Sequence, residues 1–135
     1  MKFKKMKILF TLIFMPICSF AYGGADGVYL SEHTVLQIIV VDANTVAATT
    51  TVVLGACSGS IVGLGKINGK ILKFTPREKL KGSETCEVLV EFDAKFQSAK
   101  ISADFCSAYS GASCGWEGDV LKKKQINFSP NLRKP

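Results

Sequence analysis

The sequence predicts an all-β domain: a small antiparallel meander of about seven or eight strands, closed as a barrel or folded as a sandwich, with two disulfides. Short runs rich in Val, Ile and Thr alternate between apolar and polar residues, as half-buried strands do. Residues typical of turns separate these runs. The length of 135 residues and the hydrophobic fraction of 47% suit one domain with one core, and they exclude a disordered chain or a multi-domain enzyme.

The first 21 residues have the features of a secretory signal peptide. Four lysines within the first seven residues are followed by an apolar run from Ile8 to Met15. The small residues Ser19 and Ala21 suit a cleavage site. Because the apolar run is shorter than the roughly 20 residues that span a bilayer, we expect cleavage and a mature chain that begins near Tyr22.

The predicted domain organisation has three parts. Residues 1–21 are the signal peptide, residues 22–124 a single β domain, and residues 125–135 an irregular C-terminal tail. We expect a periplasmic or secreted protein with no transmembrane span in the mature chain. The alternative is a lipoprotein anchored through Cys18, which the large side chain of Ile17 before it disfavours.

The formal net charge of +6 does not indicate a nucleic-acid-binding protein. Lys2, Lys4, Lys5 and Lys7 lie in the predicted signal peptide, so the rest of the chain has 13 basic and 11 acidic side chains. Binding to a phosphate backbone needs a marked positive excess on one surface. We therefore expect no nucleic-acid partner.

Alternation and turn residues place the strands in order. The tripeptide Asp42-Ala43-Asn44 separates two of them, and Asn68-Gly69 predicts a hairpin because these residues tolerate the positive φ of a type I′ turn. The segment Pro76–Ser83 is charged and aperiodic, so it is predicted to be a loop. The expected strands are Gly27–Ser31, Thr34–Val41, Thr45–Leu54, Ser60–Ile67, Lys70–Thr75, Thr85–Phe92, Lys100–Phe105 and Trp116–Lys122.

In two of the expected strands, Thr85–Phe92 and Lys100–Phe105, the alternation of residues shows which face is buried. The period of two separates their apolar residues from charged residues such as Glu87 and Asp104. If the two strands pair, Glu91 and Lys100 would be neighbours on the outer face. The side chains expected to face the core are Cys86, Val88, Val90, Phe92, Ile101, Ala103 and Phe105.

Four cysteines remain after cleavage, and an even number in an exported chain predicts two disulfides. We prefer the pair Cys106–Cys114, which would close a short ring, together with Cys57–Cys86, which would join distant strands. The two crossed pairings remain alternatives. Without a C-x-x-C spacing, and with His33 as the only histidine, we expect neither a metal site nor a cofactor.

No motif predicts an enzyme. The segment Gly111–Gly115 matches G-x-S-x-G, but that motif needs a strand-to-helix turn in a parallel sheet and a downstream histidine, and His33 lies upstream. The glycines of Gly63–Gly69 lead into a hairpin rather than a helix, so they are expected to let strands bend. The outward Glu87 and Glu91 are interpreted as solvated residues rather than an acid–base pair.

The segment from Cys106 to Asp119 holds the best binding candidates. It contains the only tryptophan, Trp116, with Tyr109 and the small polar residues Ser110 and Ser113. Aromatic side chains with Ser and Gly on a rigid loop suit protein recognition. These four residues are the predicted binding site, with Tyr109 at the tip of the loop. The alternative for Trp116 is an inward side chain that fills the core.

The chain resembles the small exported lysozyme inhibitors of Gram-negative bacteria in its signal peptide, short β-barrel domain and disulfides. Ser110-Gly111-Ala112-Ser113 is similar to the start of the S-G-x-x-Y loop of some of these inhibitors, with Cys114 in place of the tyrosine. The stretch Cys106–Leu121 also looks like the cysteine-containing ending of uncharacterised secreted bacterial proteins. The first resemblance implies a barrel with a loop that enters the cleft of a cell-wall hydrolase.

We therefore expect an exported binding or inhibitory protein whose partner is another exported protein, with a cell-wall hydrolase as the first candidate. A periplasmic immunity protein, a structural or surface-adhesion protein, and a small-ligand carrier remain alternatives. A roomy barrel interior would favour the carrier. A filled core with one exposed aromatic loop would favour the binding protein.

Overall fold

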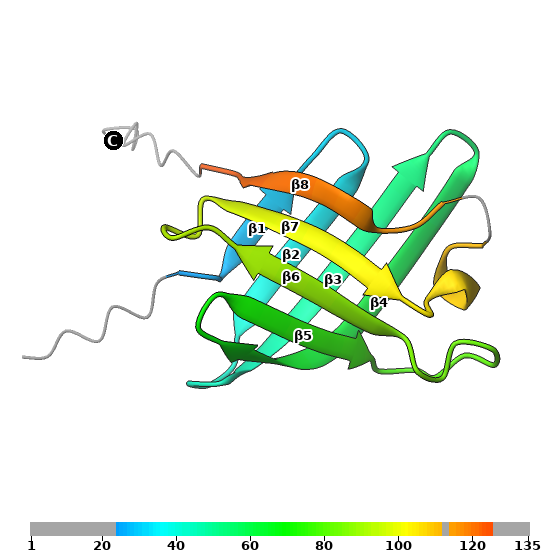
Figure 1. The fold of residues 1–135 in the computed structure, drawn as a ribbon, viewed down its shortest axis with the longest axis horizontal. Coiled ribbons are helices and arrows are strands. Elements are labelled where there is room, and N and C mark those ends of the chain that lie inside the picture. The colour runs from blue at the N-terminus through cyan, green and yellow to red at the C-terminus, as the bar shows by residue number, and fades with distance from the viewer. Residues whose placement is uncertain (1–23, 112–113, 126–135) are drawn as a thin grey trace, which may run out of the picture.

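The computed structural model describes residues 24–111 and 114–125, which form eight antiparallel strands closed into a barrel (Figure 1). Each strand pairs with the next one along the chain, and β8 returns to pair with β1. The all-β prediction is confirmed, and the barrel is the form that the chain adopts. The elements are β1 (Gly27–Leu30), β2 (Thr34–Val40), β3 (Thr45–Leu54), β4 (Cys57–Asn68), β5 (Ile71–Pro76), β6 (Glu87–Phe92), β7 (Ser98–Asp104), the 3₁₀ helix η1 (Ser107–Tyr109) and β8 (Glu117–Lys123).

Some expectations concern residues outside the described ranges. These are the signal peptide (1–21), the lipidation site Cys18, the binding residue Ser113 and all but the first residue of the tail (125–135). Within residues 24–111 and 114–125, no helix is long and apolar enough to cross a membrane.

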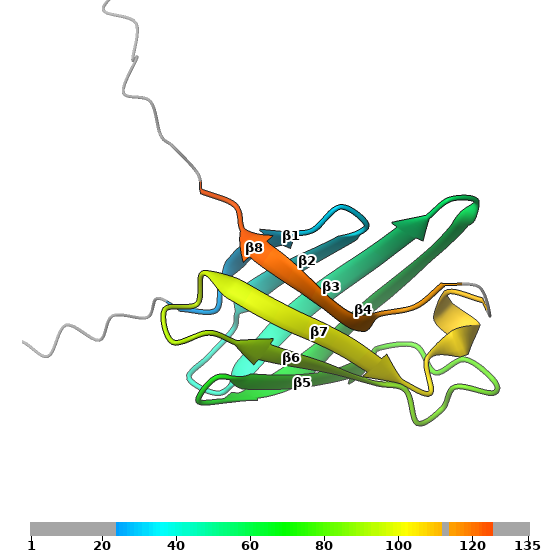
Figure 2. The same ribbon diagram turned by 45° about the horizontal axis from the view of Figure 1, so that its top comes forward.

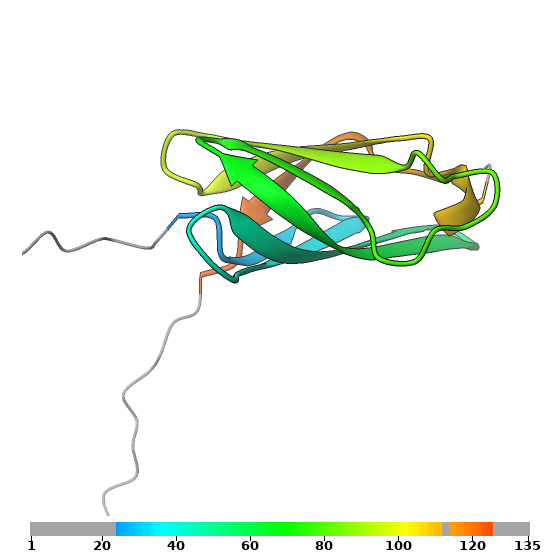
Figure 3. The same ribbon diagram turned by 90° about the horizontal axis from the view of Figure 1, so that it is seen from below.

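The barrel is flattened into two facing walls, as the turned views show (Figure 2 and Figure 3). Strands β1 to β4 form one wall, β6 and β7 form the other, and β5 and β8 cross between them. The described segment begins and ends at one end of the barrel, where the Lys123 ammonium donates a hydrogen bond to the Gly24 carbonyl (2.8 Å). The β3–β4 turn and η1 lie at the opposite end.

Alternate residues of the strands fill the interior, which explains the period of two in the sequence. An eight-stranded barrel is just wide enough for side chains to fill it. The largest fully buried side chains are Trp116, Tyr29, Phe74, Leu36, Ile38, Ile61, Leu72, Ile101, Leu121, Val46, Val88 and Val90. This packed interior does not favour a small-ligand carrier.

The predicted burial of β6 is confirmed, and Glu91 pairs with Lys100 across β6 and β7 as expected. The predicted burial of Phe105 is wrong. Strand β7 ends at Asp104, and the backbone of Phe105 has a φ of 58°, in the left-handed region. This turn breaks the alternation, so that the Phe105 side chain is 74% exposed.

The predicted hairpin forms, but its turn lies one residue later than expected: Asn68 pairs with Ile71, so Gly69 and Lys70 make the turn. Only Gly69 of this turn has a positive φ, 60°, so the expected type I′ conformation is wrong. Two other turns are held by Asp42 and Asp93, whose carboxylates each accept hydrogen bonds from two backbone N–H groups. These hydrogen bonds hold the pKa of both carboxyls below its usual value. The turns between strands are therefore fixed by local chemistry that the sequence carries.

Strands β4 and β5 approach closely at Gly63 and Gly65. A Cβ atom at Gly63 would overlap the carbonyl oxygen of Thr75, and one at Gly65 would overlap that of Lys73. Only glycine fits such an approach without a shift of the backbone. The glycine-rich segment is therefore structural, as its lead into a hairpin predicted.

The two disulfides join Cys57 to Cys114 and Cys86 to Cys106. Their number is confirmed, but the preferred pairing is wrong. Cys86 precedes β6 and Cys106 follows β7, so these antiparallel neighbours bring the two cysteines together, with 4.6 Å between their Cα atoms. Helix η1 then carries the chain toward the β3–β4 hairpin, where Cys114 reaches Cys57.

Candidate functional site

The candidate residues gather at one end of the barrel, which we call the disulfide end. It comprises the β3–β4 turn, the loop 77–86 and the described residues of the segment 105–116. Cys57–Cys114 ties this segment to β4, and Cys86–Cys106 ties it to the start of β6. Both links reduce the conformations open to the segment, so its surface is organised before any partner binds.

Tyr109, the predicted tip of the binding loop, is half-buried on η1. Its hydroxyl donates a hydrogen bond to the Glu78 carbonyl oxygen (2.6 Å) and accepts one from the Leu80 N–H (3.2 Å). These bonds join η1 to the loop that follows β5. The hydroxyl therefore has a structural role at the disulfide end.

Replacing Tyr109 with phenylalanine is expected to lower the free energy of unfolding by about 1–2 kcal/mol, because two backbone groups lose their partner. Urea denaturation measures this loss. Ser107→Ala is the matched control, since Ser107 is an exposed residue of the same helix, and a change below about 0.5 kcal/mol is expected there. Equal stability of Tyr109→Phe and the parent protein would contradict the structural role of the hydroxyl.

Ser110 and Trp116 are both buried. The Ser110 hydroxyl donates a hydrogen bond to the Cys114 carbonyl oxygen (2.7 Å). The β7–β8 pairing continues to Trp116, whose carbonyl oxygen accepts the Ala103 N–H (2.9 Å), and the Trp116 side chain is only 1% exposed. The prediction of Trp116 as a surface contact is wrong, and the alternative of an inward side chain is confirmed.

Phe105 is the exposed aromatic residue of the disulfide end, and Phe96 offers a direct comparison. Both residues have positive φ values, 58° at Phe105 and 54° at Phe96. Phe96 packs on Phe92, with 5.2 Å between the ring centroids, so burial offsets its backbone strain. The Phe105 ring is exposed to solvent, and folding gains little from its burial.

No signal in the sequence indicates that the Phe105 side chain is exposed. The alternation of Ile101 and Ala103 extends to residue 105 and predicts an inward side chain. A positive φ at a phenylalanine is uncommon, and no neighbouring glycine or asparagine marks it. Phe105 is therefore a candidate site residue that only the structure identifies.

A cleft opens beside Phe105 because the barrel closes over a short seam. Strand β8 pairs with β1 at two positions, Tyr29–Lys123 and Leu30–Lys122, and the start of β8 lies apart from β1. We call the resulting space of about 470 Å³ the seam cleft; it is lined by His33, Thr34, Val52, Leu54, Cys114, Gly115, Glu117, Gly118 and Asp119. Phe105 and Glu117 both line a smaller hollow of about 220 Å³. Since Glu117 belongs to both, Phe105 and the seam cleft share one surface.

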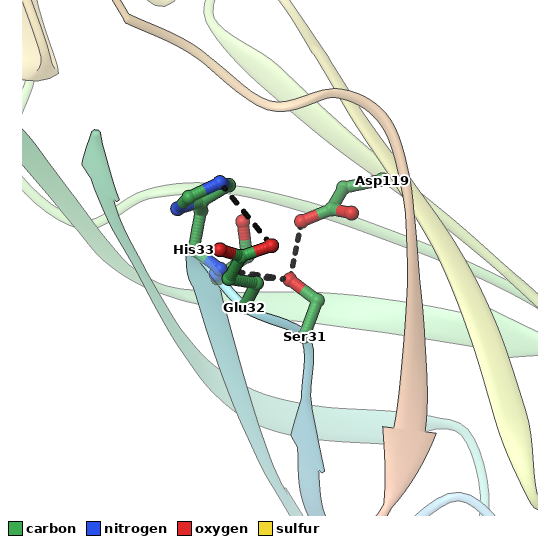
Figure 4. A network of polar contacts seen from close by, with 5 residues as sticks. Ser31, Glu32, His33 and Asp119 are labelled. Atoms are coloured by element: carbon green, nitrogen blue, oxygen red, sulfur yellow. Dashed lines mark hydrogen bonds and ion pairs between the residues drawn. The ribbon is translucent and has the colours of Figure 1, made fainter. Parts of the chain in front are cut away.

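His33 and Asp119 line the seam cleft, and Ser31 lies next to Asp119 (Figure 4). The Ser31 hydroxyl donates a hydrogen bond to the Asp119 carboxylate and accepts one from the Thr34 N–H (3.0 Å). The His33 Nε2 atom lies 3.8 Å from the Glu32 carboxylate. A catalytic triad needs the histidine to take the proton of the serine, with the aspartate behind the histidine. Here the serine bonds directly to the aspartate, so the network ties β1 to β8 and activates no nucleophile.

No protein-family model matches this chain, nor does any curated protein or solved structure. Across the described ranges, no three His, Cys, Asp or Glu side chains are grouped to hold a metal ion. What the disulfide end offers is an exposed aromatic ring, an adjoining cleft and two disulfides that hold both in place.

Proposed function

We propose that this protein is an exported protein-binding module that uses the disulfide end, with Phe105 as its central anchor. The observation that carries the proposal is the combination of exposure and backbone strain at Phe105, directly beside the disulfide-bonded Cys106. Two disulfides are typical of proteins in an oxidising compartment, which supports export.

The turn after β7 does not by itself explain a phenylalanine. The left-handed conformation costs an L-residue about 1–2 kcal/mol, and glycine adopts it freely. Strained residues cluster at functional sites, where the surrounding structure holds them in place. Rigid, exposed aromatic rings are frequent among the residues that contribute most to protein–protein binding.

The surroundings of Phe105 indicate the chemistry of the partner. Glu117 lines the same small hollow as Phe105, and Asp119 lines the adjoining seam cleft with the exposed, apolar Leu54. A complementary surface has an apolar pocket for the Phe105 ring with cationic side chains at its edge. A lysozyme-type cell-wall hydrolase is the first partner to test, and entry of Phe105 into its substrate cleft would inhibit it.

The test compares Phe105→Ala, Phe105→Gly and Phe96→Ala for binding to a panel of purified lysozyme-type hydrolases by calorimetry. We expect Phe105→Ala to weaken binding by about 2 kcal/mol, roughly 30-fold, and to change stability by less than about 0.5 kcal/mol. Phe105→Gly should weaken binding equally but be about 0.5–1 kcal/mol more stable than Phe105→Ala, because glycine relieves the strain. Phe96→Ala should lower stability and leave binding intact.

These variants separate the two parts of the proposal. If a hydrolase binds and Phe105→Ala binds it as tightly as the parent protein does, Phe105 is not the anchor. If no hydrolase of the panel binds, the partner class is wrong.

A further inference from the structure

Most of the outer face of the β2–β3–β4 wall lacks charged side chains. The exception is Lys66 in β4, whose ammonium donates a hydrogen bond to the Thr45 hydroxyl at one end of the wall. No outward residue is charged from Val35 to Ile39 in β2, from Thr45 to Val53 in β3, or from Ser58 to Leu64 in β4. Surfaces of ordinary composition are about 25–35% charged, so several charges would be expected over this area. We call this area the uncharged wall. The facing wall of β6 and β7 has charged outward residues such as Glu87, Glu91 and Lys100.

Exposed apolar side chains are distributed over the uncharged wall. Val35, Ile39, Val53, Val62 and Leu64 are between 42% and 62% exposed. Ile39, Ala47 and Leu64 lie opposite one another and make one apolar row across the three strands. Clusters of exposed apolar residues mark interaction sites.

The polar residues of the uncharged wall are able to bond to copies of themselves. Thr49, Thr51, Ser58 and Ser60 carry hydroxyls, and Gln37 carries an amide. Hydroxyl and amide groups both donate and accept hydrogen bonds, whereas ammonium and carboxylate groups do only one of these. Such a surface is self-complementary.

We propose that the uncharged wall binds a second copy of this chain, wall against wall, about a two-fold axis. A two-fold interface places each surface against itself, so charged residues would risk contact between like charges. The uncharged wall avoids this repulsion.

The two ends of the uncharged wall favour one orientation of the pair. Lys66 follows the wall at the end of β4, and Glu32 precedes it in the turn before β2, at the disulfide end. An axis that lies in the interface and crosses the strands at right angles brings Lys66 of one copy to the end of the wall at which Glu32 of the other copy lies. The same axis points the two disulfide ends in opposite directions, so both remain free to bind.

The area indicates a weak dimer. Three strands about 4.8 Å apart and about eight residues long, at 3.3 Å per residue, cover about 400 Å² per copy. Stable complexes bury about 800 Å² per partner. We therefore expect dissociation in the range of tens of micromolar or weaker.

Analytical ultracentrifugation of the purified exported protein tests the proposal. The average mass should rise from monomer toward dimer as the concentration increases to about 200 µM. Thr49 lies at the centre of the wall, between Gln37 and Val62. Thr49→Glu and Thr49→Lys should each weaken association at least about tenfold, because like charges meet near the axis.

An equimolar mixture of Thr49→Glu and Thr49→Lys should associate again, which a folding defect in either variant would not allow. Val120→Glu is the control, because Val120 is an exposed residue of β8 opposite Lys100 and lies outside the wall; this variant should dimerise like the parent protein. A parent protein that stays monomeric at every concentration overturns the proposal. So does unchanged association of Thr49→Glu, or failure of the mixture to associate.

Discussion

Replacing Cys57 and Cys114 together with alanine is expected to lower the free energy of unfolding by about 4 kcal/mol. These two residues are 57 positions apart, so their disulfide closes a long loop in the unfolded chain. In the chain-entropy model, longer loops lose more freedom when they are closed, and the folded state gains correspondingly. A domain of this size has a total stability of about 5–15 kcal/mol, so this loss removes a large part of it.

The second disulfide provides the matched comparison. Cys86 and Cys106 are 20 positions apart, and replacing both with alanine should cost about 3 kcal/mol, less than the longer loop. Urea denaturation without reductant measures both values, and peptide mapping without reduction shows the pairing directly. A peptide that links Cys106 to Cys114 would contradict the structure.

Trp116→Ala is expected to lower the free energy of unfolding by about 3–5 kcal/mol. The indole fills the barrel interior and is almost completely buried, so its removal leaves a cavity that the closed sheet cannot collapse to fill. The indole Nε1 atom has no hydrogen-bond partner among the described residues, which offsets part of what its burial contributes. Denaturation followed by circular dichroism measures the loss without depending on tryptophan fluorescence.

Val120→Ala is the control for Trp116→Ala. Val120 lies in β8, the strand that follows Trp116, but it points outward and is exposed, so its truncation should cost less than about 1 kcal/mol. Comparable losses in the two variants would contradict the inward position of Trp116.

The strands could be predicted because their local signals agree with the final fold. Strand β3 begins and ends at Thr45 and Leu54 as expected, since turns set both ends. Strand β4 begins earlier than expected, at Cys57, because the pairing of Leu54 with Cys57 continues to the tip of the hairpin. The length of a paired strand depends on its partner as well, so the alternation within β4 alone does not show where β4 begins.

One of the two disulfides, Cys86–Cys106, can be inferred from the sequence. If Glu91 lies opposite Lys100, antiparallel register places Cys86 opposite Phe105 and therefore next to Cys106. The few residues between Cys106 and Cys114 instead favour a short ring closed by these two cysteines. Helix η1 occupies those residues and directs the chain toward β4 instead.

The candidate site was less predictable than the fold. The structure places Tyr109 at the disulfide end, but nothing in the sequence indicates that loop 77–86 would engage its hydroxyl. The exposure of Phe105 depends on a single backbone angle, which the period of two does not encode.

The two ends of the described chain lie far from the proposed binding surface. Gly24 and Gln125 lie at the end of the barrel remote from both disulfides. A purification tag, a fluorescent fusion or an attachment to a sensor surface can follow Gln125 and still leave Phe105 facing the solution. If the protein is attached to a chip through its C-terminal side, every molecule exposes its disulfide end to an injected hydrolase.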